Sequence, residues 1–309
     1  MIRRIKTVIS ALLISAVFSY SYAQDCDISI RVVSQEESGL TKSAEEFLVK
    51  RIEQISNNEN FVLSAGSSLA IVPKLICLTK DVLPGPPTKY SLNFELTLYM
   101  IDVQTGMIYY SETIPLKSVD NSESKAQISA LMQLKPTSPQ LASLFKEGRK
   151  KAVAYYDANG ALIIAKAKKL ASMREYEEAL YTILAIPDCS KYSEEATAEA
   201  INIYDTYMNE LCNQNLQAAK LAWVSEQNSD GAKKAAEYLS LIYPGYGCYS
   251  ESQELYNEIK SEISDDEDFD KGLILSEIEL ENNKINAMRD IGVAYGSGQQ
   301  PNTTNVFGY

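Results

Sequence analysis

The sequence predicts a small α+β domain with an antiparallel sheet, followed by an all-α domain built from helical repeats. Three observations support this fold class. Residues 90–100 alternate between apolar and polar side chains, as in a strand with one buried face. After residue 158 the apolar residues keep helical spacing. One motif also recurs 57 residues further along the chain, around Pro187 and again around Pro244, which is typical of stacked structural units.

The first 23 residues have the pattern of an export signal. A basic start precedes an apolar run over residues 8–18, and small residues ending at Ala23 follow it, so cleavage before Gln24 is expected. An uncleaved anchor is the alternative. Because Cys26 does not directly follow the small residues, no lipid anchor is expected, and no later segment is apolar enough to span a membrane. We therefore expect a protein of the bacterial periplasm, with association to the outer membrane or secretion as alternatives.

The composition excludes several functional classes. Removing the three basic residues of the signal leaves 26 basic and 41 acidic residues, a net charge of −15, which disfavours a nucleic-acid partner. Histidine is absent, so Ser-His-Asp and Cys-His catalysis are excluded and zinc loses its usual nitrogen ligand. We expect no enzymatic activity, no cofactor and no metal. A hydrolase that uses two carboxylates stays open as an alternative.

Residues 24–157 are predicted to form the α+β domain. Thr41 or Ser43 can cap its first helix, a Pro-rich loop over 83–87 separates two strands, and a hairpin turn is expected over 102–106. The predicted elements are, in order, a strand over 26–33, a helix over 41–55, strands over 70–79, 90–100 and 107–116, and helices near 124–134 and 140–156.

This order resembles a known exported fold. The residues that carry the resemblance are the strand Tyr90–Met100, then Ile101-Asp102, Thr105-Gly106 and Tyr109-Tyr110-Ser111. The arrangement is similar to the small α+β domain shared by penicillin-binding-protein activator lipoproteins, the curli-secretion channel protein and the amino-terminal part of the Tol-system β-propeller protein. The resemblance implies an adaptor near the outer membrane or cell wall and transfers no catalytic residue. The chain departs from it because it lacks a lipid anchor and a second long hairpin, so a secretion pore is not expected.

Residues 158–264 are predicted to form the helical repeat domain. The segment Asp157-Ala158-Asn159-Gly160 is interpreted as the turn between the domains, in which Asn159 can cap the next helix. The predicted helices cover 160–173, 175–186, 193–212, 214–228, 231–243 and 250–263.

The repeated motif occupies matching positions in two units. Residues Arg174–Leu180 resemble the turn and second-helix start of a tetratricopeptide repeat, although the unit length differs; a plain helical bundle is the alternative. Tyr192 and Tyr249 follow the repeated prolines and are expected to wedge the loop against the next helix rather than to bind a ligand. The motif comprises Ala179, Tyr181, Leu184, Pro187 and Tyr192-Ser193-Glu194, matched by Ala236, Tyr238, Leu241, Pro244 and Tyr249-Ser250-Glu251; Ala179, Leu184, Ala236 and Leu241 are expected in the core.

The five cysteines permit disulfides in an oxidising compartment. Cys189 and Cys212 bracket one predicted helix of about 30 Å, too long for a disulfide, which needs Cα atoms within about 7 Å. In an up-and-down stack the loops that hold Cys212 and Cys248 lie at the same end. We therefore predict Cys212–Cys248, a free Cys189 and a Cys26–Cys77 pair; five reduced cysteines are the alternative.

The last part of the chain contains a predicted helix and a predicted flexible tail. The helix covers 271–294 within the segment 265–295, and residues 296–309 are rich in Gly, Ser, Gln, Pro, Asn and Thr before an apolar end. The acidic stretch Asp266–Glu277 resembles a calcium loop, but Lys271 occupies the turn position where glycine is required. An acidic helix start is the preferred interpretation.

These observations predict an exported, non-enzymatic adaptor. The first domain would dock on one envelope component, and the helical repeats would hold a peptide or helix of a protein partner. The alternative is a carbohydrate- or cell-wall-binding module that uses exposed tyrosines, since the chain has 20 of them, with cell-wall glycan as the partner.

Overall fold

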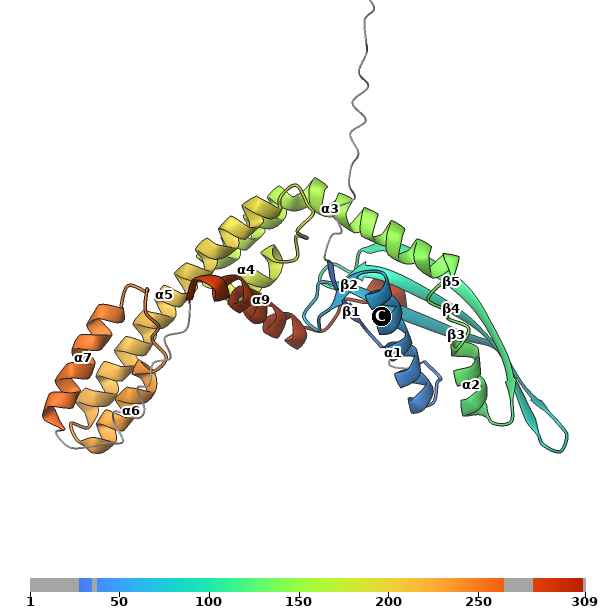
Figure 1. Ribbon diagram of the computed structural model, residues 1–309, viewed down its shortest axis with the longest axis horizontal. Helices are drawn as coiled ribbons and strands as arrows, with labels where there is room; N and C mark the ends of the chain where they lie inside the picture. Colours follow the sequence, from blue (N-terminus) through green and yellow to red (C-terminus); the bar gives the residue numbers. More distant parts are fainter. Residues whose placement is uncertain (1–27, 35–37, 264–279, 308–309) are drawn as a thin grey trace, which may run out of the picture.

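The computed structural model describes residues 28–34, 38–263 and 280–307, and it confirms the predicted α+β class (Figure 1). The amino-terminal half contains β1 (Ile28–Val32), α1 (Lys42–Asn58), β2 (Phe61–Leu63), β3 (Leu69–Leu83), β4 (Lys89–Asp102), β5 (Ile108–Asp120) and α2 (Glu123–Leu131). The helices that follow are α3 (Pro139–Ser172), α4 (Tyr176–Ile183), α5 (Ser193–Ser225), α6 (Ser229–Leu239), α7 (Tyr249–Glu262), α9 (Leu280–Gly298) and α10 (Thr304–Phe307).

A five-stranded sheet in the order β2-β1-β3-β4-β5 forms the centre of the first half. The period-two pattern of β4 is confirmed, because Leu92, Phe94, Leu96 and Leu98 are all buried on one face. Helices α1 and α2 and the first half of α3 cover this face. The sheet is mixed rather than antiparallel, since β1 runs parallel to both β2 and β3. The short strand β2 was not predicted.

The β4–β5 hairpin turn is confirmed, and Asp102 organises it. Its Oδ1 accepts hydrogen bonds from the backbone N–H groups of Gln104 and Thr105, both at 2.9 Å, and from the Thr105 hydroxyl at 3.1 Å. Gly106 has a φ of 69°, which a residue with a side chain adopts only with strain. A buried aspartate and a glycine at this spacing therefore close the hairpin.

Helix α3 passes without interruption through the segment predicted to be a turn between domains, so that prediction is wrong. Asn159 does not cap a helix; its side-chain amide donates to the carbonyl of Tyr155 one turn earlier, at 2.9 Å. Gly160 is buried inside the helix, where a Cβ would overlap the ring of Tyr192. The glycine thus provides room for the Tyr192 ring, which packs against α3, an earlier helix, and not against the next helix as predicted.

The core changes along α3 even though the helix is continuous. Residues of α3 up to Ala152 pack into the core of the sheet, and residues from Tyr156 onward pack with α4, α5 and α9. A third apolar cluster joins the second half of α5 to α6 and α7. Helix α5 is also continuous across Asn213, where two helices were predicted; the Asn213 side chain bonds the Asn209 carbonyl at 2.8 Å.

The carboxyl-terminal segment docks on the sheet, which corrects the prediction of a flexible tail over 296–309. Helix α9 extends to Gly298, and the chain then reaches the sheet face opposite α1 and α2. The N–H of Asn302 donates to the Val103 carbonyl at 2.7 Å, and Val306 is 4% exposed in a cluster on that face. The cluster is formed by Ala70, Val72, Ile101, Val103 and Val306. Segment 280–307 therefore joins the helical half to the sheet.

Candidate functional site

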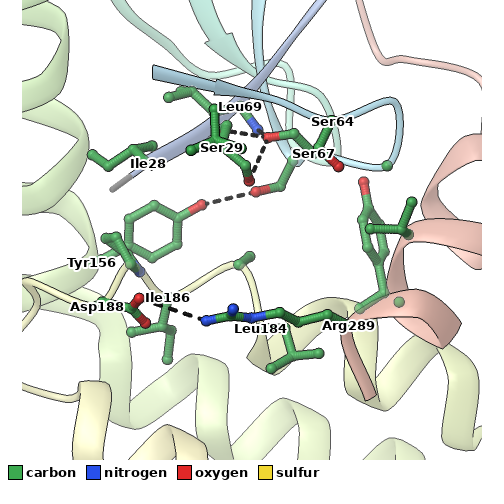
Figure 2. Close-up of a pocket in the computed structure, with 18 of the residues that line it drawn as sticks. Ile28, Ser29, Ser64, Ser67, Leu69, Tyr156, Leu184, Ile186, Asp188 and Arg289 are labelled. Carbon is green, nitrogen blue, oxygen red and sulfur yellow. Dashed lines mark hydrogen bonds and ion pairs between the residues drawn. The ribbon is translucent and has the colours of Figure 1, made fainter. Parts of the chain in front are cut away.

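A cavity of about 330 Å³ lies where the two halves of the molecule meet (Figure 2). Segments that are far apart in the sequence line it: the start of β1, the β2–β3 turn, the middle of α3, the α4–α5 loop and α9. Its lining residues include Ile28, Ser29, Val62, Ser64, Ser67, Ser68, Tyr156, Leu184, Ile186, Asp188, Arg289 and Val293. No motif in the sequence indicated this site, because each of the five segments contributes only two to six residues.

The β2–β3 turn brings three serines to the cavity, and hydrogen bonds fix two of them. The Ser67 hydroxyl donates to the Ser29 carbonyl at 2.7 Å and accepts from the N–H of Leu69 at 3.1 Å. The hydroxyls of Ser68 and Tyr156 lie 3.4 Å apart. This arrangement makes one wall of the cavity polar and well ordered (Figure 2).

Tyr156 continues into a buried network behind the cavity. Its hydroxyl donates to Asp102 Oδ2 at 3.4 Å, so the cavity wall is connected to the β4–β5 turn. Tyr155 and Tyr156 lie edge to face, with ring centroids 5.5 Å apart, and the rings of Tyr109 and Tyr155 pack at a tilt, with centroids 5.6 Å apart. Burial, and next the charge of Asp102, raises the pKa of the Tyr156 phenol; burial is also the main cause of the raised pKa of Tyr109.

These phenols predict a loss of stability at alkaline pH. A phenol whose pKa is higher in the folded chain than its ordinary value of about 10 stabilises the fold below pH 10, and this stabilisation is lost as the pH rises further. We expect the melting temperature to fall above about pH 10, and Tyr109→Phe to flatten that fall. Thermal melts between pH 8 and pH 11 measure it, with Tyr238→Phe on the exposed face of α6 as the control. An equal fall in Tyr109→Phe and the unmodified chain would contradict the assignment.

An ion pair lies at the mouth of the cavity. Arg289 Nη2 of α9 and Asp188 Oδ2 of the α4–α5 loop are 3.6 Å apart, and both side chains are more than half exposed. A second arginine, Arg31 of β1, donates to the carbonyls of Ala65 at 3.1 Å and Gly296 at 3.3 Å. Burial lowers the pKa of Arg31, and the nearby Tyr181 partly opposes this. Asp188 is the one carboxylate among the described residues that line the cavity, so these residues do not offer the facing pair that a hydrolase requires.

The matching residues of the two repeated motifs, around Pro187 and around Pro244, have only partly similar environments in the structure. Ala179 and Ala236 are both buried, as expected, and Leu184 is half-buried. Leu241, predicted to be in the core, is 53% exposed, so that prediction is wrong. Pro187 lines the cavity. Pro244 belongs to the α6–α7 connection, and Tyr249 is the first residue of α7, half-buried against the third apolar cluster.

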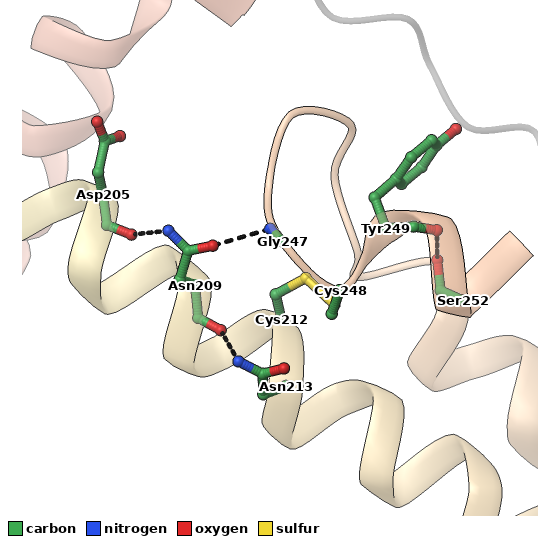
Figure 3. Close-up of a disulfide and its surroundings, with 8 residues drawn as sticks. All are labelled: Asp205, Asn209, Cys212, Asn213, Gly247, Cys248, Tyr249 and Ser252. Carbon is green, nitrogen blue, oxygen red and sulfur yellow. Dashed lines mark hydrogen bonds between the residues drawn. A yellow bond between two sulfur atoms is a disulfide. The ribbon is translucent and has the colours of Figure 1, made fainter.

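The Cys212–Cys248 disulfide is present, with a Cα–Cα distance of 5.9 Å (Figure 3). It joins α5 to the loop before α7. Beside it, Asn209 donates to the Asp205 carbonyl at 2.8 Å and accepts from the N–H of Gly247 at 2.9 Å, which orients the same loop.

The other two cysteine predictions are wrong. Cys77 is free and exposed, so it does not pair with Cys26, which itself lies outside the described residues. Cys189 is disulfide-bonded rather than free. The prediction assumed that Cys77 lies inside the sheet core, but β3 is exposed from Ile76 onward, and Cys77 belongs to this exposed part.

Two further predictions concern segments that the structure leaves out. The candidate calcium stretch Asp266–Glu277 and the signal over residues 1–23 both lie outside the described residues, as does much of the helix predicted over 271–294. Among the described helices, none combines the length and the hydropathy that crossing a membrane requires. No cluster of metal-ligating side chains occurs within the described ranges.

Comparisons with known proteins found one similar solved structure and no family. No protein-family model and no curated protein matches the chain. Among solved structures, it is similar to a protein of Caulobacter crescentus provisionally described as a lipoprotein. The two sequences are 11% identical, the match covers 39% of this chain and 82% of that chain, and the TM-score is 0.22. A likeness this low carries no argument about the function.

Proposed function

We propose that the chain is an exported, non-enzymatic adaptor of the bacterial cell envelope that holds one protein partner on its sheet and another on its helices. The observation that supports this most directly is the connection between the two halves. The continuous helix α3 runs from one half into the other, and segment 280–307 runs back from the helices to the sheet (Figure 1). Such a double connection holds two binding surfaces at a fixed separation.

Each half exposes apolar side chains away from the junction. Strands β3 and β4 extend beyond the helices as an arm, and Leu78, Val82 and Leu83 on it are between 43% and 59% exposed. On α5, Leu221 and Val224 are 68% and 69% exposed, one helical turn apart. Exposed apolar side chains that lie side by side, as Leu221 and Val224 do on α5, are typical of protein interaction surfaces.

Export is supported by the signal pattern of residues 1–23 and by the disulfide. The Cys212–Cys248 bond requires an oxidising compartment, such as the periplasm, to form and persist. The helices from α3 to α7 would then serve as degenerate tetratricopeptide-like units, with the buried alanines Ala179 and Ala236 at the sites of close helix approach.

The tyrosines give less support to the carbohydrate-binding alternative. Within the described ranges, Tyr238 is 40% exposed, while the other tyrosines are buried or half-buried. Many of them are held by partners inside the protein; Tyr176, for example, donates to Glu210 at 2.7 Å and stacks on Tyr207. A stacking platform for sugars needs several exposed rings side by side, so the adaptor is the preferred proposal.

The test is crosslinking in the native organism, followed by purification through a tag joined after Tyr309 by a flexible linker. We expect a reproducible protein partner for each surface. Val82→Asp with Leu83→Asp should remove the partner of the arm, and Leu221→Asp with Val224→Asp should remove the partner of the helices. Each pair should leave the other partner bound.

Met132→Asp provides the matched control, because Met132 is also an exposed apolar residue, at 57%, but lies on neither surface. It should change neither partner. Recovery of cell-wall fragments alone, or of partners that all four aspartate substitutions leave unchanged, would overturn the adaptor proposal and favour the glycan-binding module.

A further inference from the structure

The junction cavity has the features of a ligand site rather than of a packing defect. Empty cavities inside proteins are normally small and lined by apolar groups, whereas this one has ordered hydroxyls on one wall and an ion pair at its mouth. Its volume of about 330 Å³ is within the range of small-molecule sites, which combine mostly apolar walls with a few polar groups that orient the ligand.

Some polar side chains that line the cavity already have hydrogen-bond partners within the protein, and others do not. Ser67 and Ser68 are engaged in the hydrogen bonds of the wall, and the Tyr156 hydroxyl is directed to Asp102. Ser64 also lines the cavity, and its hydroxyl has no hydrogen-bond partner among the described residues. Among the described residues, Arg289 pairs with Asp188 alone, at 3.6 Å, which leaves most of its five N–H donors unused. The polar groups that remain available to a ligand are therefore mainly hydrogen-bond donors, on Ser64 and Arg289.

We propose that the cavity binds a small carboxylate with an apolar body, with Arg289 as the counter-ion and Ser64 as a hydrogen-bond donor. The side chains of Leu184, Ile186 and Val293 provide the apolar wall for the body of the ligand. An ionised carboxylate only accepts hydrogen bonds, and its two oxygens can accept two parallel N–H bonds from the planar guanidinium of an arginine. A phosphate dianion is disfavoured, because Asp188 stays beside the single arginine at the mouth.

Two sources share this chemistry: a free amino-acid-like or short-chain acid, and the carboxyl-terminal residue of a peptide. The probes are therefore N-acetyl-leucine, isovalerate and an acetylated Ala-Ala-Leu tripeptide, each beside its carboxamide. Binding to the full mature chain is measured by calorimetry and by the shift in melting temperature. We expect the acids to bind about tenfold or more tightly than their amides, since a charge-assisted hydrogen bond is lost in the amide.

Three variants connect the binding to this cavity. Arg289→Gln should weaken the acids about tenfold and leave the amides unchanged, which removes the difference between them. Lys284→Gln is the matched control, because Lys284 lies on the same helix and pairs with Asp205 at 3.0 Å, away from the cavity lining. Val62→Trp, at a position 52% exposed on the cavity rim, should weaken the acids by narrowing the mouth without changing the core.

Binding of the tripeptide acid but not of the free acids would assign the site to a peptide terminus, and the reverse would assign it to a free metabolite; both support the proposal. Absence of binding by every acid at millimolar concentration, equal binding of acids and amides, or binding that Arg289→Gln leaves unchanged would overturn it. None of these results depends on the adaptor surfaces, which lie on other residues.

Discussion

Replacing Cys212 and Cys248 together with serine is expected to lower the free energy of unfolding of the helical end by about 3 to 4 kcal/mol. The bond closes a loop with a sequence separation of 36 residues, and removing such a constraint from the unfolded chain gives a loss of this size. The cost is concentrated locally, because α6 and α7 contact the rest of the molecule chiefly through α5. Urea denaturation followed by circular dichroism measures the loss.

Hydrogen exchange shows which segments lose stability when the Cys212–Cys248 disulfide is removed. Amides of α6, of the α6–α7 loop and of α7 should exchange faster in the double variant, while β3 and β4 should keep their protection. Cys77→Ser is the control, since Cys77 is exposed and free and its replacement should leave the unfolding midpoint unchanged. An unchanged midpoint in the double variant would show that helix packing alone holds this end of the molecule.

Local patterns predicted the elements whose cause is local. The alternation of β4 follows directly from one buried face, and the Asp102–Gly106 turn follows from an aspartate that accepts from the next backbone N–H groups and a glycine with positive φ. Both are decided by residues within a few positions of each other. The sequence therefore sufficed for the sheet hairpin and for the α+β class.

The errors arise where a distant residue decides the local structure. Asn159-Gly160 looks like a turn, but the glycine is required inside α3 because the Tyr192 ring packs against it. The polar composition after Gly296 indicates flexibility, yet Val306 finds an apolar patch on β3 and β4 more than 200 residues earlier in the chain. The cavity was missed for the same reason, since five separate segments provide its lining.

Gly66→Ala is expected to loosen the contact between the two halves. Gly66 is buried in the β2–β3 turn, and a Cβ at this position would overlap the backbone of Val293 in α9. A backbone cannot rotate away as a side chain can, so the turn and α9 must separate. Overpacking of this kind costs about 1 to 3 kcal/mol, and we expect the upper part of that range.

The separation should also break the contacts on either side. Arg31 would lose its hydrogen bond to the Gly296 carbonyl, which is 3.3 Å long, and the Tyr181 ring would lose its contact with Gly296. Because the carboxyl-terminal segment continues from this point, its docking on the sheet should weaken as well. Hydrogen exchange of residues 284–307 measures this, and a thermal melt gives the total loss of stability.

Gly298→Ala is the control for Gly66→Ala. It adds the same methyl group near the junction, on α9, but without an overlap with the backbone of another segment. Gly298 is the last residue of that helix, and nothing lies within 4 Å of a Cβ placed on it. The substitution should therefore be neutral or slightly stabilising, because alanine loses less backbone entropy than glycine on folding. If both variants melt at the temperature of the unmodified chain, α9 does not hold the halves together, and the fixed separation on which the adaptor proposal depends must come from α3 alone.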